Sequence, residues 1–332
     1  MAYTTIDDPS AYFQTVLYTG NEQARDITFD GNSDMQPDWV WGKIRTQTYS
    51  HRSFDSVRGT GKGLHNDTNE AEFTQNANVS AFNSDGFSLG NDNGMNSDGD
   101  THVAWNWKET ADAGFDIVTY SGSSASSKTV SHNLSAVPKM ILVKCRSAEE
   151  NWAVYHHTLG NTHALFLNTD GASSDTPVFA DTTPTSSVFS VNADDRTGAN
   201  GKTYVAYVFA EKQGFSKFSS YTGNGNADGT FVYTGFKPAF FMIKRTTGSG
   251  YDWLMYDNKR QVSFNVIDDF LNASSNAAET TGNANQSLDF LSNGVKHRGN
   301  GASSNGDGVV YIYMAFAENP FTTSTSIPTT AR

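Results

Sequence analysis

The stretch that decides the fold covers residues 221–257 and reads YTGNGNADGTFVYTGFKPAFFMIKRTTGSGYDWLMYD. It joins a Tyr-Thr-Gly opening to a proline, an apolar run, a lysine and an arginine. Closely similar orders open earlier in the chain, at Tyr18 and at Tyr120. The copies lie about one hundred residues apart, which is the size of a domain and exceeds the roughly 20–50 residues of solenoid repeats. The chain is therefore predicted to contain one ancestral module three times.

Each copy places a proline six residues before a lysine, an acid or histidine on the following strand, and an aromatic residue near its end. The repeated positions are Pro37, Lys43, Asp55 and Trp107 in the first copy, Pro138, Lys144, His156 and Phe209 in the second, and Pro238, Lys244, Asp257 and Phe316 in the third. A catalytic pair would not be expected in triplicate with one member exchanged. We interpret the lysine and the acid as a cross-strand ion pair that fixes strand register.

The local pattern is that of an all-β protein. Short apolar runs are separated by clusters of Gly, Asn, Asp, Ser and Thr, and sustained helical periodicity is missing. In the first copy we expect strands near 13–19, 25–29, 38–45, 49–56, 79–83, 86–89 and 101–108. Seven strands in a copy of about one hundred residues favour an antiparallel β-sandwich or jelly roll. Tight turns with positive φ at both central residues are expected before each closing strand, at Asp98-Gly99, Asn200-Gly201 and Asp307-Gly308.

The predicted organisation is three tandem modules with a short segment at each end. Module 1 covers residues 13–110, module 2 covers 111–213 and module 3 covers 214–320, and a polar tail covers 321–332. Residues 5–12 have no counterpart in the later copies. We therefore expect residues 1–12 to be free to act as an attachment arm.

Composition and charge exclude several classes of protein. The 332 residues include 23 basic and 35 acidic side chains, a net charge of −12, which disfavours nucleic-acid binding. No stretch approaches the roughly 20 apolar residues of a membrane span, so no membrane insertion is expected. The acidic start is unlike a signal peptide. A single cysteine, Cys145, excludes an intramolecular disulfide framework and indicates maturation in a reducing cytoplasm.

The catalytic and ligand-binding motifs considered predict no catalytic residue, no cofactor and no metal site. The glycine-rich residues 59–63 lack the Ser or Thr that follows the lysine of a phosphate loop, and a turn is favoured there. His156, His157 and His163 are not expected to converge on a metal, because neighbouring strand residues point to opposite faces. The loop containing Asp92, Asn96, Asp98 and Asp100 resembles a calcium loop only in composition. A solvated hairpin tip is favoured there, and calcium binding stays open.

Residues 221–257 resemble a repeat that is common in structural proteins of marine bacteriophages. The likeness rests on Tyr-Thr-Gly-Asn-Gly, then Gly-Phe-x-Pro, an apolar run, Lys-Arg and Trp-x-x-Tyr-Asp. Residues 54–59, 84–90 and 103–107 resemble the family's other conserved blocks. The second copy departs most from the pattern. The resemblance implies a virion component of the tail-fibre type, assembled in the host cytoplasm, and carries over no catalytic residues.

These observations predict a non-enzymatic virion structural protein, a tail-fibre or receptor-binding component that presents loops on rigid β modules for host attachment. A capsid decoration, cement or head-fibre protein is the alternative. A carbohydrate-active enzyme is a weaker one, because Trp39, Trp41, Trp105 and Trp107 could stack sugars, although strand alternation favours core packing of at least half of them. Expected partners are other virion proteins, a host surface glycan or protein receptor, and further copies of the chain. A homotrimer is favoured, formed through module faces because coiled-coil heptads and collagen repeats are missing.

Overall fold

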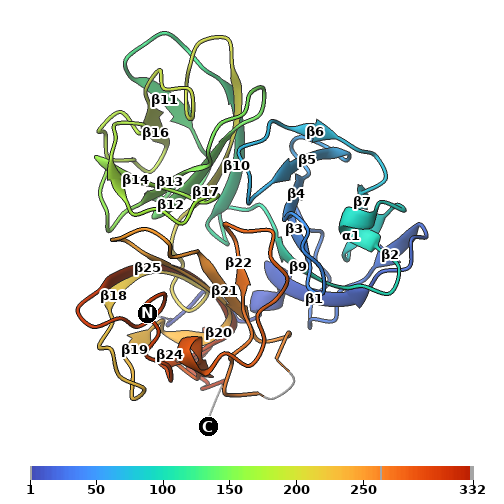
Figure 1. Cartoon of the computed structure of the whole chain (residues 1–332), viewed down its shortest axis with the longest axis vertical. Coiled ribbons are helices and arrows are strands. Elements are labelled where there is room, and N and C mark those ends of the chain that lie inside the picture. The colour runs from blue at the N-terminus through green and yellow to red at the C-terminus, as the bar shows by residue number, and fades with distance from the viewer. Residues whose placement is uncertain (1, 262–263, 330–332) are drawn as a thin grey trace.

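The computed structural model describes residues 2–261 and 264–329. About 40% of the residues lie in strands and 3% in helices, arranged in multiple antiparallel sheets. The predicted all-β fold is therefore confirmed. Figure 1 shows three lobes grouped around a common centre, each built on one large sheet.

Module 1 pairs a six-stranded sheet with a three-stranded one. The large sheet has the order β1 (Phe13–Thr19), β9 (Thr101–Trp107), β3 (Trp39–Ile44), β4 (Arg52–Asp55), β5 (Lys62–His65) and β6 (Phe73–Thr74). The small sheet has the order β2 (Arg25–Ile27), β8 (Phe87–Leu89) and β7 (Val79–Phe82). A one-turn helix, α1 (Asn93–Asn96), precedes β9, and a 3-10 turn, η1 (Pro9–Ala11), precedes β1. The seven expected strands are present with slightly different ends, whereas the short β5 and β6 were not predicted.

Modules 2 and 3 repeat this arrangement. In module 2 the order is β10 (Phe115–Ser121), β17 (Thr203–Phe209), β12 (Met140–Cys145), β13 (Ala153–His156), β14 (His163–Phe166) and β15 (Ser174–Asp175), with β11 (Lys128–Ser131) and β16 (Val188–Val191) forming the small sheet. In module 3 it is β18 (Ser216–Thr222), β25 (Val310–Pro320), β20 (Phe236–Arg245), β21 (Leu254–Asp257) and β22 (Leu271–Asn272). Its small sheet is β19 (Phe231–Tyr233), β24 (Gly294–His297) and β23 (Leu288–Leu291), with a 3-10 turn, η2 (Ala284–Gln286), before β23.

The three large sheets share one strand order. The opening strand pairs with the closing aromatic strand, which pairs with the Pro–Lys strand and then with its successors. Tight turns bridge Thr110 to Phe115 and Lys212 to Ser216, where the module boundaries were expected. The three large sheets therefore share one topology, and triplication of one module stays a prediction.

The turn before each closing strand differs from the expected one. Gly99, Gly201 and Gly308 have positive φ values of 73°, 79° and 66°. Within the described residues, the Asp or Asn that precedes each of them does not have a positive φ. The prediction of two central residues with positive φ is therefore wrong, and only the glycine needs this conformation.

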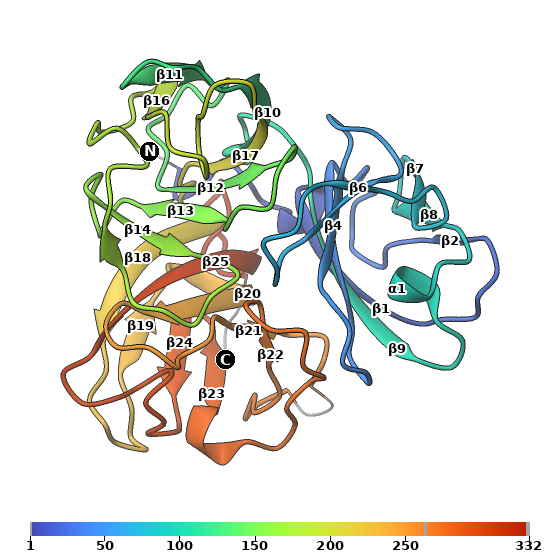
Figure 2. The same cartoon turned by 45° about the horizontal axis from the view of Figure 1, so that its top comes forward.

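The main core lies where the three large sheets turn one face toward the centre (Figure 2). The ring of Phe316 lies 5.7 Å from that of Trp107 and 6.0 Å from that of Phe209, so the closing strands of all three modules meet. The opposite faces in modules 1 and 2 cover separate smaller cores beneath the small sheets. The predicted homotrimer stays a prediction, but the aromatic faces that could form it are already buried within one chain.

The four tryptophans considered as sugar platforms are core residues. Trp39, Trp41, Trp105 and Trp107 are at most 1% exposed. Residues two apart share a strand face, so both members of each pair point to the centre. Trp39, for example, stacks on Tyr207 of module 2 with ring centroids 4.4 Å apart. These rings are therefore not accessible to a polysaccharide.

The N-terminal segment is packed rather than free, so the predicted attachment arm is wrong in its structural basis. Thr4 and Ile6 are buried, and Ile6 belongs to the main core. Tyr3 donates a hydrogen bond to the carbonyl of Gly235 at 2.5 Å, and Asp7 accepts hydrogen bonds from Ser324. Burial of apolar area stabilises the packed segment by more than its conformational entropy favours a free one. Residues 2–12 therefore tie the start of the chain to module 3 and to the tail.

Deleting residues 1–12 should therefore destabilise the protein instead of leaving its modules intact. Loss of the buried Ile6 side chain alone should cost roughly 1.5–3 kcal/mol of unfolding free energy. Urea unfolding followed by tryptophan fluorescence would measure this. Ile327→Ala is a suitable control, because Ile327 is 62% exposed and should matter little. An unchanged urea midpoint for the truncated protein would contradict the packing role.

Candidate functional site

The recurring polar residues lie where the modules meet. We call the contact of modules 1 and 2 the first interface, that of modules 2 and 3 the second, and that of modules 3 and 1 the third. Lys144 Nζ donates to the carbonyl of Asn69 in module 1 at 3.1 Å, and Lys244 Nζ donates to that of Asp170 in module 2 at 3.0 Å. Lys43 Nζ donates hydrogen bonds within module 1, to the carbonyls of Ile44 and Gln47.

The predicted ion pair between the repeated lysine and the acid is wrong. Asp55 lies opposite Trp39 in the β3–β4 ladder, which places it four residues away from Lys43 along the strand. All three lysine side chains are buried among backbone carbonyls. Burial lowers the pKa of Lys43, Lys144 and Lys244 to about 8. Lys144 and Lys244 therefore hold loops across module junctions, whereas Lys43 holds a loop of its own module.

One aromatic side chain in each module contacts a backbone carbonyl across an interface. Trp152 Nε1 donates to the carbonyl of His65 at 2.8 Å, and Trp253 Nε1 donates to that of Phe166 at 3.0 Å. In module 1 the equivalent residue is His51, whose Nε2 lies 3.0 Å from the carbonyl of Asn272. Each module thus contacts the preceding one in the same way, and the third contact closes the ring.

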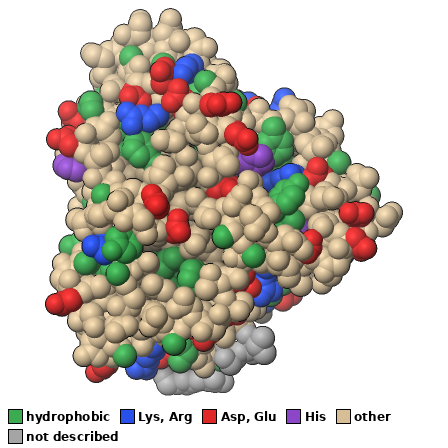
Figure 3. Space-filling model, in the orientation of Figure 1, with side chains coloured by type: hydrophobic (Ala, Val, Ile, Leu, Met, Phe, Trp, Pro, Cys, Tyr) green, Lys and Arg blue, Asp and Glu red, His purple; other side chains and the backbone are tan. Residues whose placement is uncertain are grey.

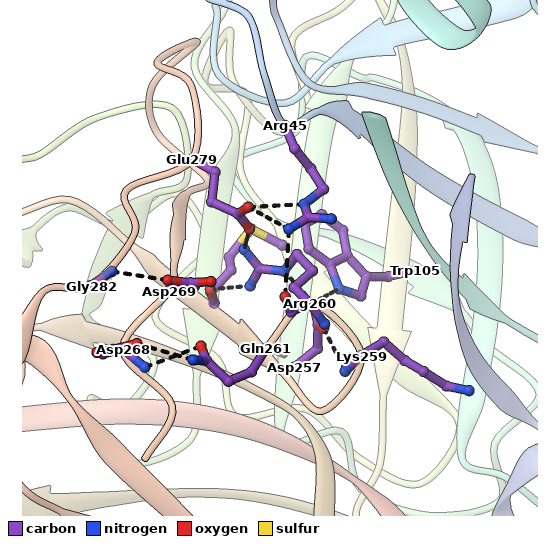
Figure 4. A network of polar contacts seen from close by, with 11 residues as sticks. Arg45, Trp105, Asp257, Lys259, Arg260, Gln261, Asp268, Asp269, Glu279 and Gly282 are labelled. Atoms are coloured by element: carbon purple, nitrogen blue, oxygen red, sulfur yellow. Dashed lines mark hydrogen bonds and ion pairs between the residues drawn. The ribbon is translucent and has the colours of Figure 1, made fainter. Parts of the chain in front are cut away.

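The third interface contains a buried network of charges (Figure 4). Arg260 Nε lies 2.5 Å from Asp257 Oδ2, which also accepts a hydrogen bond from Trp105 Nε1 of module 1 at 2.9 Å. Glu279 bridges Arg260, at 2.6 Å, and Arg45 of module 1, at 2.7 Å. Asp257 and Arg260 are almost completely buried, so each charge depends on its partners.

The first interface repeats the network with equivalent residues. Asp55 Oδ2 lies 2.5 Å from Arg58 Nε and accepts a hydrogen bond from Tyr207 Oη of module 2 at 2.7 Å. Glu72 bridges Arg58, at 3.0 Å, and Arg146 of module 2, at 2.8 Å. Burial raises the pKa of Glu72, but the two arginines outweigh this effect and hold its pKa below the usual value.

The second interface replaces the whole network. His156 and Leu159 stand where the other modules have Asp and Arg, and Ser173 stands where they have Glu. The equivalence of Ser173 rests on its backbone N–H, which bonds the carbonyl of Thr246 in module 3 at 3.0 Å, as the N–H groups of Glu72 and Glu279 bond the next module. His156 Nε2 lies 3.3 Å from the carbonyl of Tyr313. The charges of one network have thus been lost together.

Sequence reasoning found part of this site. It marked Asp55, His156 and Asp257, which the structure places at successive interfaces. It missed Arg58 and Arg260, although the Asp-x-x-Arg spacing in modules 1 and 3 was a usable signal. It also missed Glu72 and Glu279, since they lie in irregular loops whose partners come from another module.

The other candidate positions have structural roles. Asp92 caps α1 and pairs with Arg52, while Asp100 accepts hydrogen bonds from Ser97 and Thr46. His156 and His157 contact separate carbonyls of module 3. Within residues 2–261 and 264–329, no group of three or more His, Cys, Asp or Glu side chains is placed to hold a metal. No helix in that same part of the chain is long and apolar enough to cross a membrane.

The three repeated prolines precede or interrupt the Pro–Lys strands, and all are buried. Pro37 and Pro138 lie just before β3 and β12. Pro238 lies inside β20, at a point where the register with β25 shifts. A proline has no N–H for the ladder, so strand starts and bulges are the positions that tolerate it.

A polar hollow of about 260 Å³ lies beside the third interface. Its floor is apolar, from Phe13, Ala239 and Ala317. Its polar lining includes Asp8, Gln14, Thr15, Asp30, Asn258 and Glu318. The hollow is therefore built jointly by the N-terminal segment, module 1 and module 3. Figure 3 shows how charged side chains of both signs are scattered over one face of the molecule.

The fold and its junctions define a class of closed, three-module all-β proteins whose recurring polar residues join the modules. The chain belongs to the family described as a domain of unknown function, DUF7483, whose model matches residues 8–320. The match runs from the N-terminal segment to the end of β25, so it includes all three modules. No curated protein matches the chain.

Proposed function

We propose that this protein is a non-enzymatic structural component of a bacteriophage virion, of the tail-fibre or receptor-binding type. The observation that carries the proposal is the use of the recurring polar residues. Lys144, Lys244, the two Asp–Arg pairs and the two bridging glutamates all serve contacts between modules. Such a body supports exposed loops rigidly, which suits recognition rather than turnover. The virion context is supported by the resemblance of residues 221–257 to marine phage structural repeats.

A capsid decoration or head-fibre protein is the second candidate. It is favoured by the closed ring of modules, because a ring with pseudo-threefold arrangement can sit on a threefold position of a capsid lattice. Self-association, trimeric or otherwise, would have to use outer surfaces, since the central faces are buried. The weaker candidate, a carbohydrate-active enzyme, loses its main argument with the burial of the four tryptophans.

Immunogold labelling of intact particles of the phage that encodes the chain tests this proposal. We expect label at the tail, with purified particles containing the protein in stoichiometric amount. Label distributed over the head would support the decoration candidate instead. Absence of the protein from purified particles would contradict both. Hydrolysis of host polysaccharide by the purified chain, lost on changing one carboxylate, would contradict the non-enzymatic part.

A further inference from the structure

Each module ends in a glutamate that lies beside the next module. These residues are Glu109, Glu211 and Glu318, each two positions after the aromatic residue that ends the closing ladder. Two of the three pair with a lysine. Lys217 Nζ, from the following module, lies 2.7 Å from Glu211 Oε1, and Lys237 Nζ, from the same module, lies 2.8 Å from Glu318 Oε1.

Glu109, at the first interface, has no lysine at either of these two positions. The residue equivalent to Lys217 is Asp116, and the residue equivalent to Lys237 is Gln36. Next to Pro37, Asp38 adds a further carboxyl. The first interface therefore gathers three carboxyls where each of the other two glutamates has a lysine.

Hydrogen bonds hold these three carboxyls together. The backbone N–H of Glu109 donates to Asp38 Oδ2 at 2.7 Å, and Glu109 Oε1 accepts from the N–H of Ile117 in module 2 at 3.0 Å. Asp116 Oδ2 accepts from the N–H of Asn133 at 2.7 Å, and the Asp116 side chain is hydrogen-bonded to that of Glu109. Ionised carboxyls only accept hydrogen bonds, so this last contact needs one proton.

The surroundings favour retention of that proton. Asp116 is 4% exposed, and Glu109 is half-buried. Burial, and then the carboxyls of Asp116 and Asp38, raise the pKa of Glu109 to about 7, although the N–H of Ile117 favours the ionised form. His132, which follows β11, also faces Asp116, but burial lowers the pKa of this histidine. His132 therefore supplies no positive charge near neutral pH.

We propose that the first interface contains a pH switch, in which a proton shared by Glu109 and Asp116 replaces the lysine of the other two interfaces. With the proton bound, Glu109 holds the N–H of Ile117 and ties the end of module 1 to the edge of β10. Without it, Glu109 and Asp116 repel each other, and Asp38 adds to the repulsion. The edge of β10 then separates more easily from Glu109, while the Arg58 network of the same interface keeps its partners.

The pH range of the switch follows from the closed and open forms of this contact. When the contact is open, Glu109 is in water and has a pKa of about 4.3. When it is closed, Glu109 keeps its proton up to about pH 7. Opening therefore releases a proton between these two values, and the contact is weakened by up to about tenfold per pH unit as the pH rises. Above pH 7 both forms are ionised, so the weakening stops.

Hydrogen exchange of single amides, followed by NMR between about pH 5.5 and 8, tests the proposal because it measures local opening. The reporter is the amide of Ile117. The matched reference is the amide of Phe218, which donates to Glu211 at the second interface as Ile117 donates to Glu109. We expect the protection factor of Ile117, divided by that of Phe218, to fall by up to about tenfold per pH unit as far as pH 7 and to be constant above it.

Three variants assign the effect to the carboxyl pair. Asp116→Lys copies the second interface, and Glu109→Gln removes the titrating group, so each should make the ratio independent of pH. Asp112→Asn changes an exposed acid in the turn before β10 and should leave the pH dependence in place. Protection of Phe218 shows whether each variant is folded, and either of the first two variants decides the test alone.

Two results would overturn the proposal. The first is a ratio that does not change between pH 5.5 and 7 in the unaltered chain. The second is a pH dependence that persists in Asp116→Lys or in Glu109→Gln, because it would then arise from another group, such as His132.

Discussion

Replacing Arg58 with methionine should lower the free energy of unfolding by about 3–5 kcal/mol, the range seen when one partner of a buried ion pair is removed. Arg58 and Asp55 have fully buried side chains, and Arg58 also holds Glu72. Without Arg58, the Asp55 carboxylate keeps the hydroxyl of Tyr207 and a backbone N–H as its partners among the described residues. Urea unfolding would measure the loss as a lower midpoint with an unchanged slope.

Two comparisons make this result specific. Arg260→Met should have a similar cost, because Arg260 has the same partners at the third interface. Asp228→Asn should leave stability nearly unchanged, because Asp228 is 84% exposed in its pair with Lys296. A cost for Arg58→Met no larger than that for Asp228→Asn would contradict the importance of the network.

The chain itself contains a rescue for this variant. The triple variant Asp55→His, Arg58→Leu and Glu72→Ser copies the second interface, where His156, Leu159 and Ser173 stand in place of the buried Asp–Arg–Glu network. Replacing a complete buried ion network with less polar groups is often neutral or stabilising. The triple variant should therefore be more stable than Arg58→Met alone. If it is less stable, the two kinds of interface are not interchangeable.

The sequence allowed the fold class to be predicted because its signals are local. Apolar runs bounded by turn residues indicate strands wherever they occur, and this is enough to predict an all-β fold. The short β5 and β6 were missed because neither has enough apolar residues to stand out. For the paired tryptophans of β3 and β9 the sequence allowed only part of the prediction. Strand alternation shows that both members of a pair share a face, but it does not show which face is buried.

The interfaces could not be predicted in the same way. Glu72 and Arg146 are far apart in the chain, and only the closing of three modules into a ring brings them together. The free attachment arm was wrong for a related reason. Residues 2–12 look unpaired when compared with the later copies, yet their partners, Gly235 and Ser324, lie at the other end of the chain.

Acidification should unfold the protein, because several histidines are buried in the neutral form. Burial lowers the pKa of His102 to about 4, and the pKa values of His156 and His297 to about 3. In the unfolded chain a histidine titrates near about 6.5. Stability is therefore complete above pH 6.5 and is lost as the pH falls toward the folded values. One pH unit corresponds to about 1.4 kcal/mol per group, so each histidine should cost roughly 3 kcal/mol by pH 4.

Glu109 acts in the opposite direction but cannot compensate. Burial, and then the neighbouring carboxyl of Asp116, raise its pKa to about 7. The folded state therefore gains a proton there, and stability rises as the pH falls from 7 toward the ordinary value of Glu. Glu109 is partly exposed, and it is opposed by His102, His156 and His297 and by His51, whose pKa burial also lowers. The sum of the histidine terms approaches the roughly 5–15 kcal/mol that stabilises an ordinary domain, so we expect acid unfolding at a pH between about 4 and 5.

His102→Tyr tests the cause with a residue that the chain already uses. His102 pairs with Tyr18 in its ladder, and the equivalent residues in modules 2 and 3 are Tyr204 and Tyr311. In the variant the free energy of unfolding should fall less steeply between pH 6.5 and 4. The slope should decrease by up to about 1.4 kcal/mol per pH unit, which is the contribution of one proton. His163 is only partly buried, so His163→Tyr is the matched control for introducing a tyrosine in place of a histidine. An unchanged slope for His102→Tyr would mean that burial of this histidine does not drive acid unfolding.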